Sequence, residues 1–337
     1  MIARLLSSIV RRPSSCFMKL KPNLAADGAI LLTTFIWGST FSVARGVLDH
    51  WPPLTYLAVR MPLAALVFAL LFPRQVFGAS RAAWRAGATL GALMGVGFIG
   101  QTTGLVYTTP AKSAFITGIT TPLVPVVAYA LWRARPSREN LLGIVLASIG
   151  GALILAPVEV AGFNAGDLIT LSTTLLFACH INLMSAYARR IDPRQLSALQ
   201  ITVAAGVMVF AWLAVRAAAW GWGAEALPPG LAREATPPVW SGAVAWQIAY
   251  LTLFGTLATF LLWAWGQARM TATHAAVIFS LEPVFATAFA VLLRGSAEWT
   301  GPRATLGALL VLTGVIVSEL RWGRERRRTR KSGDEPV

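Results

Sequence analysis

The sequence predicts an all-α membrane protein in which ten transmembrane helices form two inverted five-helix repeats. Its 337 residues are 56% hydrophobic and only 13% charged, with a mean hydropathy of +0.63, which is too apolar for an ordinary soluble domain. Apolar segments of membrane-spanning length also follow one another along the chain. Positions in the first half recur in the second half after fixed shifts. Because each repeat would hold an odd number of helices, the second must enter the membrane in the opposite orientation.

Prolines and short polar turns separate the apolar segments and set the expected helix boundaries. One long connection, Ala218–Ser241, is rich in proline, glycine and alanine, and we expect an irregular external loop there. The chain divides into a basic tail at 1–23, a first five-helix repeat at 24–157, a second five-helix repeat at 158–320 and a basic cytoplasmic tail at 321–337. The expected helices cover residues 27–48, 54–72, 86–107, 110–132, 140–157, 166–188, 195–217, 242–267, 273–293 and 303–320.

The N-terminal tail is basic and carries no acid before Asp27. Its apolar stretch Ile2–Val10 is broken by Arg4 and is too weak for a signal-peptide core. A transit peptide and a working start at Met18 are the two alternatives for this leader. The two cysteines, Cys16 and Cys179, form no CxxC pair, so we expect no disulfide, no metal site and no cofactor.

The lysines and arginines gather in alternate connections and in the two tails. If the N-terminus is inside, most of them face the cytoplasm, which is the side that retains positive charge. The sequence therefore predicts a multi-pass protein of the plasma membrane (the bacterial inner membrane), in contact with lipids and with both termini cytoplasmic. The formal charge of +15 does not indicate a nucleic-acid partner, because such a protein gathers its basic groups on one water-exposed face. The basic residues expected outside are Lys112, Arg216, Arg233, Arg294 and Arg303.

Three shifts of the sequence align residues of the two halves. A shift of 140 aligns Asp27 with Asp167, Trp37 with Phe177, Thr40 with His180, Ser42 with Asn182, Pro53 with Pro193 and Arg60 with Gln200. A shift of 161 aligns Thr121-Pro122 with Glu282-Pro283, and a shift of 164 aligns Gly143 and Gly150 with Gly307 and Gly314. Inverted repeats with interrupted helices at matching places indicate a secondary transporter that binds its substrate near the membrane midplane.

The stretch Thr273–Leu293 is a membrane-length apolar run with one carboxylate near its middle. At ~1.5 Å per residue it is ~30 Å long, so Glu282 lies near the midplane, where a charge is costly unless it faces a partner, a watery cavity or a proton. Pro283 lacks an N–H, so carbonyls around Phe279 lose a donor and the helix is expected to break. Glu282 is therefore the expected residue for substrate-amine contact and proton coupling. The alternative is a neutral carboxylic acid bonded to a neighbouring helix.

Five stretches carry a resemblance to a known family: Trp37 to Phe41, Arg60, Ala111 to Pro122, Ser280 to Ala286, and Leu306 to Gly314. On this ordered combination, over about residues 24–320, the chain resembles the ten-helix drug/metabolite transporters of the EamA type. The resemblance implies transport of amino acids or related amphiphilic compounds, with export as the commoner direction. Members of that family usually carry a Gly-Glu pair just after the fourth and ninth helices. This chain departs from them, with Arg133-Ala134-Arg135 and Arg294 to Glu298 at those places.

Aromatic and small polar side chains recur on the expected helices of both halves, and this mixture suits an amphiphilic small molecule. For each such residue the alternative is packing, because small hydroxyl residues let helices approach closely. A lone histidine such as His180 is also more often a hydrogen-bonded packing residue. The expected substrate-binding residues are Trp37, Ser39, Thr40, Gln101, Thr117, Thr121, Phe177, His180, Asn182, Trp263, Ser280 and Glu282.

Other polar and small residues are given structural roles. Arg60 lies only about two turns from the expected outer surface, so we favour snorkelling or tying helices together over anion binding. Arg45 precedes Asp49 by four residues and is expected to form a local ion pair. Glycines at 87, 91 and 95 indicate close helix contacts, because no phosphate-binding loop motif follows a strand.

The sequence favours a secondary transporter, not an enzyme, that moves a small organic metabolite by alternating access as a monomer or homodimer. No lysine lies deep in the expected membrane region and Arg60 is alone there, so a zwitterionic, cationic or neutral solute is favoured over a multiply charged anion. Protons are the candidate coupling ion. The alternatives are an intramembrane enzyme using Glu282 and His180, a phosphorylated-sugar carrier of the same superfamily, and a membrane sensor that transports nothing.

Overall fold

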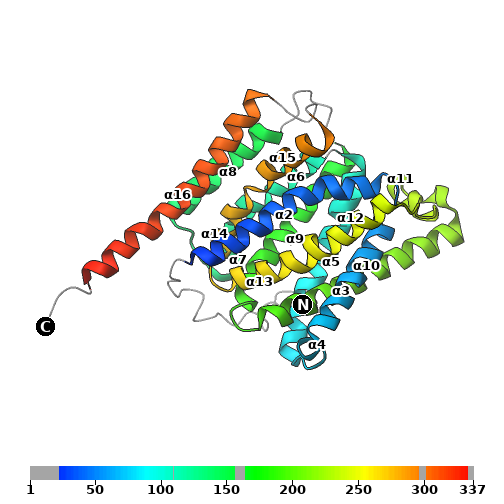
Figure 1. Ribbon diagram of the computed structural model, residues 1–337, viewed down its shortest axis with the longest axis horizontal. Helices are drawn as coiled ribbons and strands as arrows, with labels where there is room; N and C mark the ends of the chain where they lie inside the picture. Colours follow the sequence, from blue (N-terminus) through cyan, green and yellow to red (C-terminus); the bar gives the residue numbers. More distant parts are fainter. Residues whose placement is uncertain (1–22, 109, 156–163, 296–300, 333–337) are drawn as a thin grey trace.

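Each expected span forms a helix in the computed structural model, which describes residues 23–108, 110–155, 164–295 and 301–332 (Figure 1). Within these ranges, seven helices are long and apolar enough to cross a membrane, and shorter apolar helices cover Ile116–Trp132 and Thr305–Ser318. Residues 1–22, with Cys16, and residues 109, 156–163, 296–300 and 333–337 of the sequence predictions lie outside the described residues. The spans are α2 (Leu24–Leu48), α3 (Pro53–Leu71), α5 (Arg81–Tyr107), α6 with α7 (Pro110–Gly118 and Thr120–Trp132), α8 (Arg138–Leu155), α9 (Ala165–Tyr187), α10 (Pro193–Trp222), α12 with η4 and α13 (Gly242–Thr252, Leu253–Ala258 and Thr259–Gln267), α14 with α15 (Ala272–Phe279 and Glu282–Arg294), and α16 (Pro302–Ser332).

Polar side chains just before several spans fix where the helices begin. The Ser80 hydroxyl accepts a hydrogen bond from the Ala83 N–H at the start of α5. At α9, Asn164 and Asp167 cap each other's backbone N–H groups. These side chains satisfy N–H groups that the first turn of a helix leaves without an intrahelical partner. The short helix α4 (Pro73–Phe77) lies in the connection between α3 and α5.

Helix α5 packs closely against α10 through its glycines. A Cβ at Gly87 would lie 2.5 Å from Leu199 Cβ, and one at Gly91 would lie 2.5 Å from the Gln200 carbonyl oxygen. Neither position has room for a side chain. The sequence prediction of close helix contacts is therefore confirmed.

Helices α8 and α16, the fifth helix of each repeat, run side by side (Figure 1). A Cβ at Gly143 would lie 2.6 Å from the Gly314 carbonyl oxygen, and one at Gly150 would lie 2.5 Å from the Gly307 carbonyl oxygen. The shift of 164 aligns Gly143 with Gly307 and Gly150 with Gly314. In space the pairing is crossed, because Gly143 contacts Gly314 and Gly150 contacts Gly307. This reversed order makes the two helices antiparallel, as two inverted repeats require.

The fourth and ninth spans break at positions that the shift of 161 aligns. The fourth is divided between α6 and α7, and the ninth between α14 and α15. Pro283 lies in the first turn of α15, where its missing N–H removes no intrahelical hydrogen bond. The Thr121 hydroxyl donates to the Ala276 carbonyl at 3.2 Å and so joins one break to the other. The expected break after Phe279 is confirmed.

The connection between α10 and α12 is more helical than the sequence predicted. Helix α10 continues to Trp222, because alanines at 217–219 favour helix, and it ends at Gly223 with φ 88°. The irregular loop expected over Ala218–Ser241 is corrected accordingly. Its remainder contains η2 (Ala224–Ala226), α11 (Pro229–Ala232) and η3 (Arg233–Ala235).

Glu234 of η3 anchors this connection to the start of α3. Its buried carboxylate accepts hydrogen bonds from the Leu54 N–H (2.6 Å), the Thr55 N–H (3.0 Å) and the Thr55 hydroxyl (2.8 Å). Pro52, at the N-cap of α3, provides no side-chain cap, so a carboxylate of the second repeat caps a helix of the first. Burial raises the pKa of Glu234 above its ordinary value, and these hydrogen bonds oppose that rise.

Replacing Glu234 with alanine is expected to lower the free energy of unfolding by about 2–4 kcal/mol, because two buried N–H groups lose their acceptor. Thermal unfolding in detergent measures the effect. Glu225→Ala, which removes an exposed carboxylate of the same connection, should change the free energy by less than about 0.5 kcal/mol. Equal melting temperatures for the two variants would contradict the anchoring role.

Candidate functional site

A cavity of about 1080 Å³, including the part continuous with solvent, lies between helices of both repeats. Helices α2, α3, α5, α6 and α7 line it from the first repeat, and α9, η4, α13, α14 and α15 line it from the second. Its walls are largely apolar and include Phe98, Phe260 and Phe279. An apolar chamber with a few converging polar groups is the usual form of a small-molecule site.

Most of the expected substrate-binding residues come together in this cavity. The two repeats contribute both the aromatic and the polar members, and Gln101 Nε2 donates to Thr117 Oγ1 at 3.0 Å across the α5–α6 boundary. The expected residues that line the cavity are Trp37, Thr40, Gln101, Thr117, Thr121, Phe177, His180, Trp263 and Glu282.

Three of the expected substrate-binding residues, Ser39, Asn182 and Ser280, do not line this cavity. Ser39 faces α12, where its hydroxyl lies 2.6 Å from the Tyr250 hydroxyl. The Asn182 side chain is buried between helices and donates to two backbone carbonyls at 2.9 Å. Ser280 bonds to the Val277 carbonyl and borders a separate, smaller space of about 510 Å³. The two serine hydroxyls and the Asn182 amide N–H groups find partners on neighbouring helix atoms, which is consistent with a packing role.

Glu282 is the first residue of α15 and lines the cavity. Among the residues that the structure describes, no hydrogen bond or ion pair reaches its carboxylate. The N-terminal turn of a helix favours a negative charge, because its N–H groups point toward that end. The next turn is held against α2, where a Cβ at Gly38 would lie 2.5 Å from Phe285 Cβ. The backbone that carries Glu282 is thus held close to α2, and its carboxyl group lines the cavity, where a solute or a proton can reach it.

His180 borders the cavity but is well packed. Its Nε2 lies 2.9 Å from Gln200 Oε1, and its ring centroid lies 4.8 Å from that of Trp263. Since an amide oxygen only accepts, Nε2 carries the proton in this arrangement. The packing role that the sequence left open for His180 accounts for these contacts.

Four aromatic rings line the cavity at its end nearest the start of α2 and contact one another. The Trp37 ring centroid lies 5.1 Å from Trp263, 5.5 Å from Phe279 and 5.8 Å from Phe260. We call these four residues the aromatic cluster. Nearer the start of α2, a polar contact joins the first turns of α2 and α14, with His274 Nε2 3.0 Å from Asp27 Oδ1.

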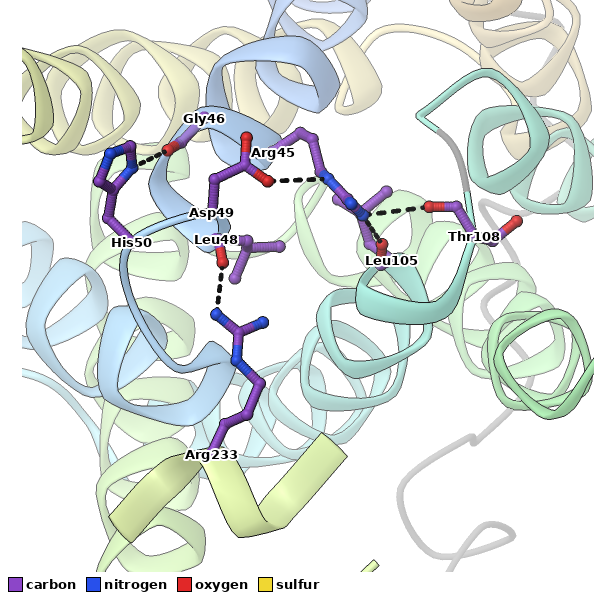
Figure 2. Close-up of polar contacts among 8 residues, drawn as sticks. All are labelled: Arg45, Gly46, Leu48, Asp49, His50, Leu105, Thr108 and Arg233. Atoms are coloured by element: carbon purple, nitrogen blue, oxygen red, sulfur yellow. Dashed lines mark hydrogen bonds and ion pairs between the residues drawn. The ribbon is translucent and has the colours of Figure 1, made fainter. Parts of the chain in front are cut away.

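Polar contacts surround the other end of α2 (Figure 2). Arg45 Nη1 donates to the Leu105 carbonyl at 2.7 Å, and Arg45 Nε lies 3.2 Å from Asp49 Oδ1, which confirms the expected ion pair. Arg233 Nη2 donates to the Leu48 carbonyl at 2.9 Å and so joins the α10–α12 connection to α2. Leu105 also lines the cavity, which places Arg45 at its edge.

Arg60 lines the cavity, which sequence reasoning did not predict. Its side chain is 8% exposed, so it does not snorkel. Its Nε and Nη2 donate to Thr256 Oγ1, Nη2 also donates to the Gly255 carbonyl, and Nη1 donates to the Tyr56 hydroxyl at 2.6 Å. These bonds do tie α3 to η4, as the sequence suggested. Tyr56, four residues before Arg60 and therefore on the same face of α3, was the available signal.

Two of the three acceptors of Arg60, Gly255 and Thr256, belong to η4, a π-helical turn that interrupts the eighth span. Such turns leave carbonyls free of the regular helical pattern and are frequent at functional sites. The Gly255 carbonyl of this turn also accepts a hydrogen bond from Trp37 Nε1 at 3.3 Å. The irregular turn therefore directs backbone acceptors toward the cavity.

Comparison with known proteins gives consistent results. Residues 24–156 and 164–320 match the EamA-like transporter family. An uncharacterized transporter of Archaeoglobus fulgidus is 30% identical over 298 residues, covering 88% of this chain and 87% of the relative. The uncharacterized transporter YyaM of Bacillus subtilis is 23% identical, covering 83% and 89%. A solved crystal structure superposes with a TM-score of 0.70 at 17% identity, covering 90% of this chain and 99% of that one, and so shares the fold.

The family match extends over both repeats, and the cavity lies between those repeats. With its matched helix breaks and antiparallel α8–α16 contact, the protein belongs to the EamA-like transporter family of the drug/metabolite transporter superfamily.

Proposed function

We propose that the protein is a secondary transporter that exports small organic metabolites, amino acids or related amphiphilic compounds, by alternating access. One observation carries this proposal: the cavity between the repeats holds a carboxyl group, Glu282, at a helix break, with aromatic walls around it. Interrupted helices near the midplane at the repeat interface are where secondary transporters bind substrate. Glu282 is proposed to exchange a proton for the solute.

Contacts between the repeats at the two ends of the cavity support a rocking motion. At one end, His274 of the second repeat pairs with Asp27 of the first. At the other end, Glu234 of the second repeat caps α3 and Arg233 bonds to the Leu48 carbonyl. For either end to open, these polar contacts between the repeats would have to break.

We further propose that both termini face the cytoplasm in the bacterial inner membrane, because lysine and arginine concentrate on that side. In this orientation the aromatic cluster lies toward the cytoplasm and Arg45 toward the outside. Protons that enter from outside and reach Glu282 would then drive solute export.

Flux measurements in liposomes containing the purified protein test the proposal. The panel comprises radiolabelled L-amino acids, organic amines and a hexose phosphate, each with and without a pH gradient. We expect at least one zwitterionic or cationic compound to move faster than in empty liposomes, at a rate that responds to the gradient. Movement of the hexose phosphate alone, chemical conversion of a compound without its movement, or no flux at all would each overturn the proposal.

A further inference from the structure

Arg60 brings into the cavity a positive charge that no described side chain neutralises. Its hydrogen-bond acceptors are two hydroxyl groups and one carbonyl, all uncharged, and the ion pairs among the described residues do not include it. These bonds use the Nε hydrogen, one Nη1 hydrogen and both Nη2 hydrogens, which leaves one Nη1 hydrogen. A buried guanidinium without a counter-charge is costly, so an anion entering the cavity would be stabilised there.

The fold does not require a cation at this position. The shift of 140 aligns Arg60 of α3 with Gln200 of α10, and Thr40 with His180. Gln200 is fully buried and uncharged, and its amide oxygen accepts the hydrogen bond of His180. The second repeat therefore packs the equivalent place with a neutral side chain of similar length. The charge of Arg60 needs another explanation than helix packing.

Arg60 and Glu282 approach the cavity from two sides of one turn of α2. A Cβ at Gly255 would lie 3.0 Å from Thr40 Cγ2 and 3.3 Å from Arg60 Nη2, which places Thr40 on the Arg60 side. The next residue, Phe41, belongs to the same buried apolar cluster as Leu281, the neighbour of Glu282, and lines the cavity with Glu282. A basic and an acidic side chain, Arg60 and Glu282, thus line the same cavity.

We propose that Arg60 binds the carboxylate of the transported solute while Glu282 faces its ammonium group, so that the substrates are zwitterions with a single carboxylate. This inference rests on the proposed transport function. The guanidinium is already oriented by three neutral acceptors, so little side-chain entropy is lost when it binds a carboxylate. A single cation matches one carboxylate but not a phosphate dianion. The surrounding aromatic walls suit an apolar side chain.

Binding of four probes that share a phenyl ring tests the assignment: L-phenylalanine, L-phenylalaninamide, phenethylamine and 3-phenylpropanoate. The full-length protein is compared with Arg60→Gln, Arg60→Lys and, as a matched control, Arg85→Gln. Glutamine is the residue that the fold already accepts at position 200. Arg85 is exposed on α5 and does not line the cavity.

The wild type and Arg85→Gln are expected to bind L-phenylalanine at least about tenfold more tightly than its amide or the amine, since a charge-assisted hydrogen bond is lost with the carboxylate. Arg60→Gln should weaken the binding of both carboxylate probes by at least about tenfold, and it should leave the affinities for the amide and the amine within about twofold of the wild type. The affinity of Arg60→Lys for the carboxylate probes should lie between those of the wild type and Arg60→Gln, because lysine keeps the charge but not the planar guanidinium.

Two results would overturn the assignment: a wild type with no preference for the carboxylate probes, or an Arg60→Gln variant that retains the preference or loses all four probes equally. If compounds of the liposome panel still move, those results leave the transport function standing. Absence of flux for every panel compound would instead overturn the transport function and the Arg60 assignment together.

Discussion

Replacing Glu282 with glutamine is expected to remove the dependence of solute flux on pH while leaving the protein folded and inserted. Glutamine has nearly the same size but no titratable proton, and it would also lose a charge-assisted contact to a substrate amine. Such contacts contribute about 1.5–3 kcal/mol, so accumulation driven by a pH gradient should fall by about tenfold or more. Flux into liposomes measured across a range of pH gives the result.

The matched control for this variant is Glu225→Gln, which neutralises an exposed carboxylate outside the cavity. Its pH profile should coincide with that of the wild type. If Glu282→Gln also keeps the wild-type profile, Glu282 has no part in proton coupling.

Replacing Gly150 with alanine is expected to destabilise the contact between α8 and α16. The added Cβ would lie 2.5 Å from the Gly307 carbonyl oxygen and 2.8 Å from the Val311 backbone nitrogen, so two helix backbones would have to move apart. Overpacking of this kind costs about 1–3 kcal/mol, partly offset by roughly 1 kcal/mol from the better helix propensity of alanine. The melting temperature in detergent should fall.

The neighbouring glycine provides the control. A Cβ at Gly151 would meet nothing within 4 Å, so Gly151→Ala should keep or raise the melting temperature through helix propensity alone. A Gly150→Ala protein that melts no lower than Gly151→Ala would show that these backbones are not in close contact.

The sequence predicted the positions of the spans and of the helix breaks, because both depend on local chemistry. Membrane length, apolar composition and the missing N–H of Pro283 act on the segment that contains them. The inverted symmetry was also visible, since the glycines of α8 and α16 recur after one fixed shift.

Which face of a span borders the cavity could not be predicted in the same way. Lipid and the bundle interior are both apolar, so hydrophobic periodicity does not separate them as it does in a soluble protein. Asn182 illustrates this difficulty. Its side-chain N–H groups donate to carbonyls of its own helix and of α7, and it does not line the cavity. Arg60 illustrates the reverse. Tyr56 was a visible signal for it, but its other acceptors, Gly255 and Thr256, lie in the π-helical turn η4, which the residue pattern of an apolar span does not predict.

The central claim is that one cavity between the repeats opens in turn to each side of the membrane. Single-cysteine labelling tests it most directly, with Thr117→Cys in a chain carrying Cys16→Ser and Cys179→Ser, since Thr117 lines the cavity. A membrane-impermeant thiol reagent is applied to right-side-out and to inside-out vesicles. The account predicts labelling of Cys at this position from both sides, slowed in each case by a transported solute. Labelling from one side only, or from neither, would contradict it.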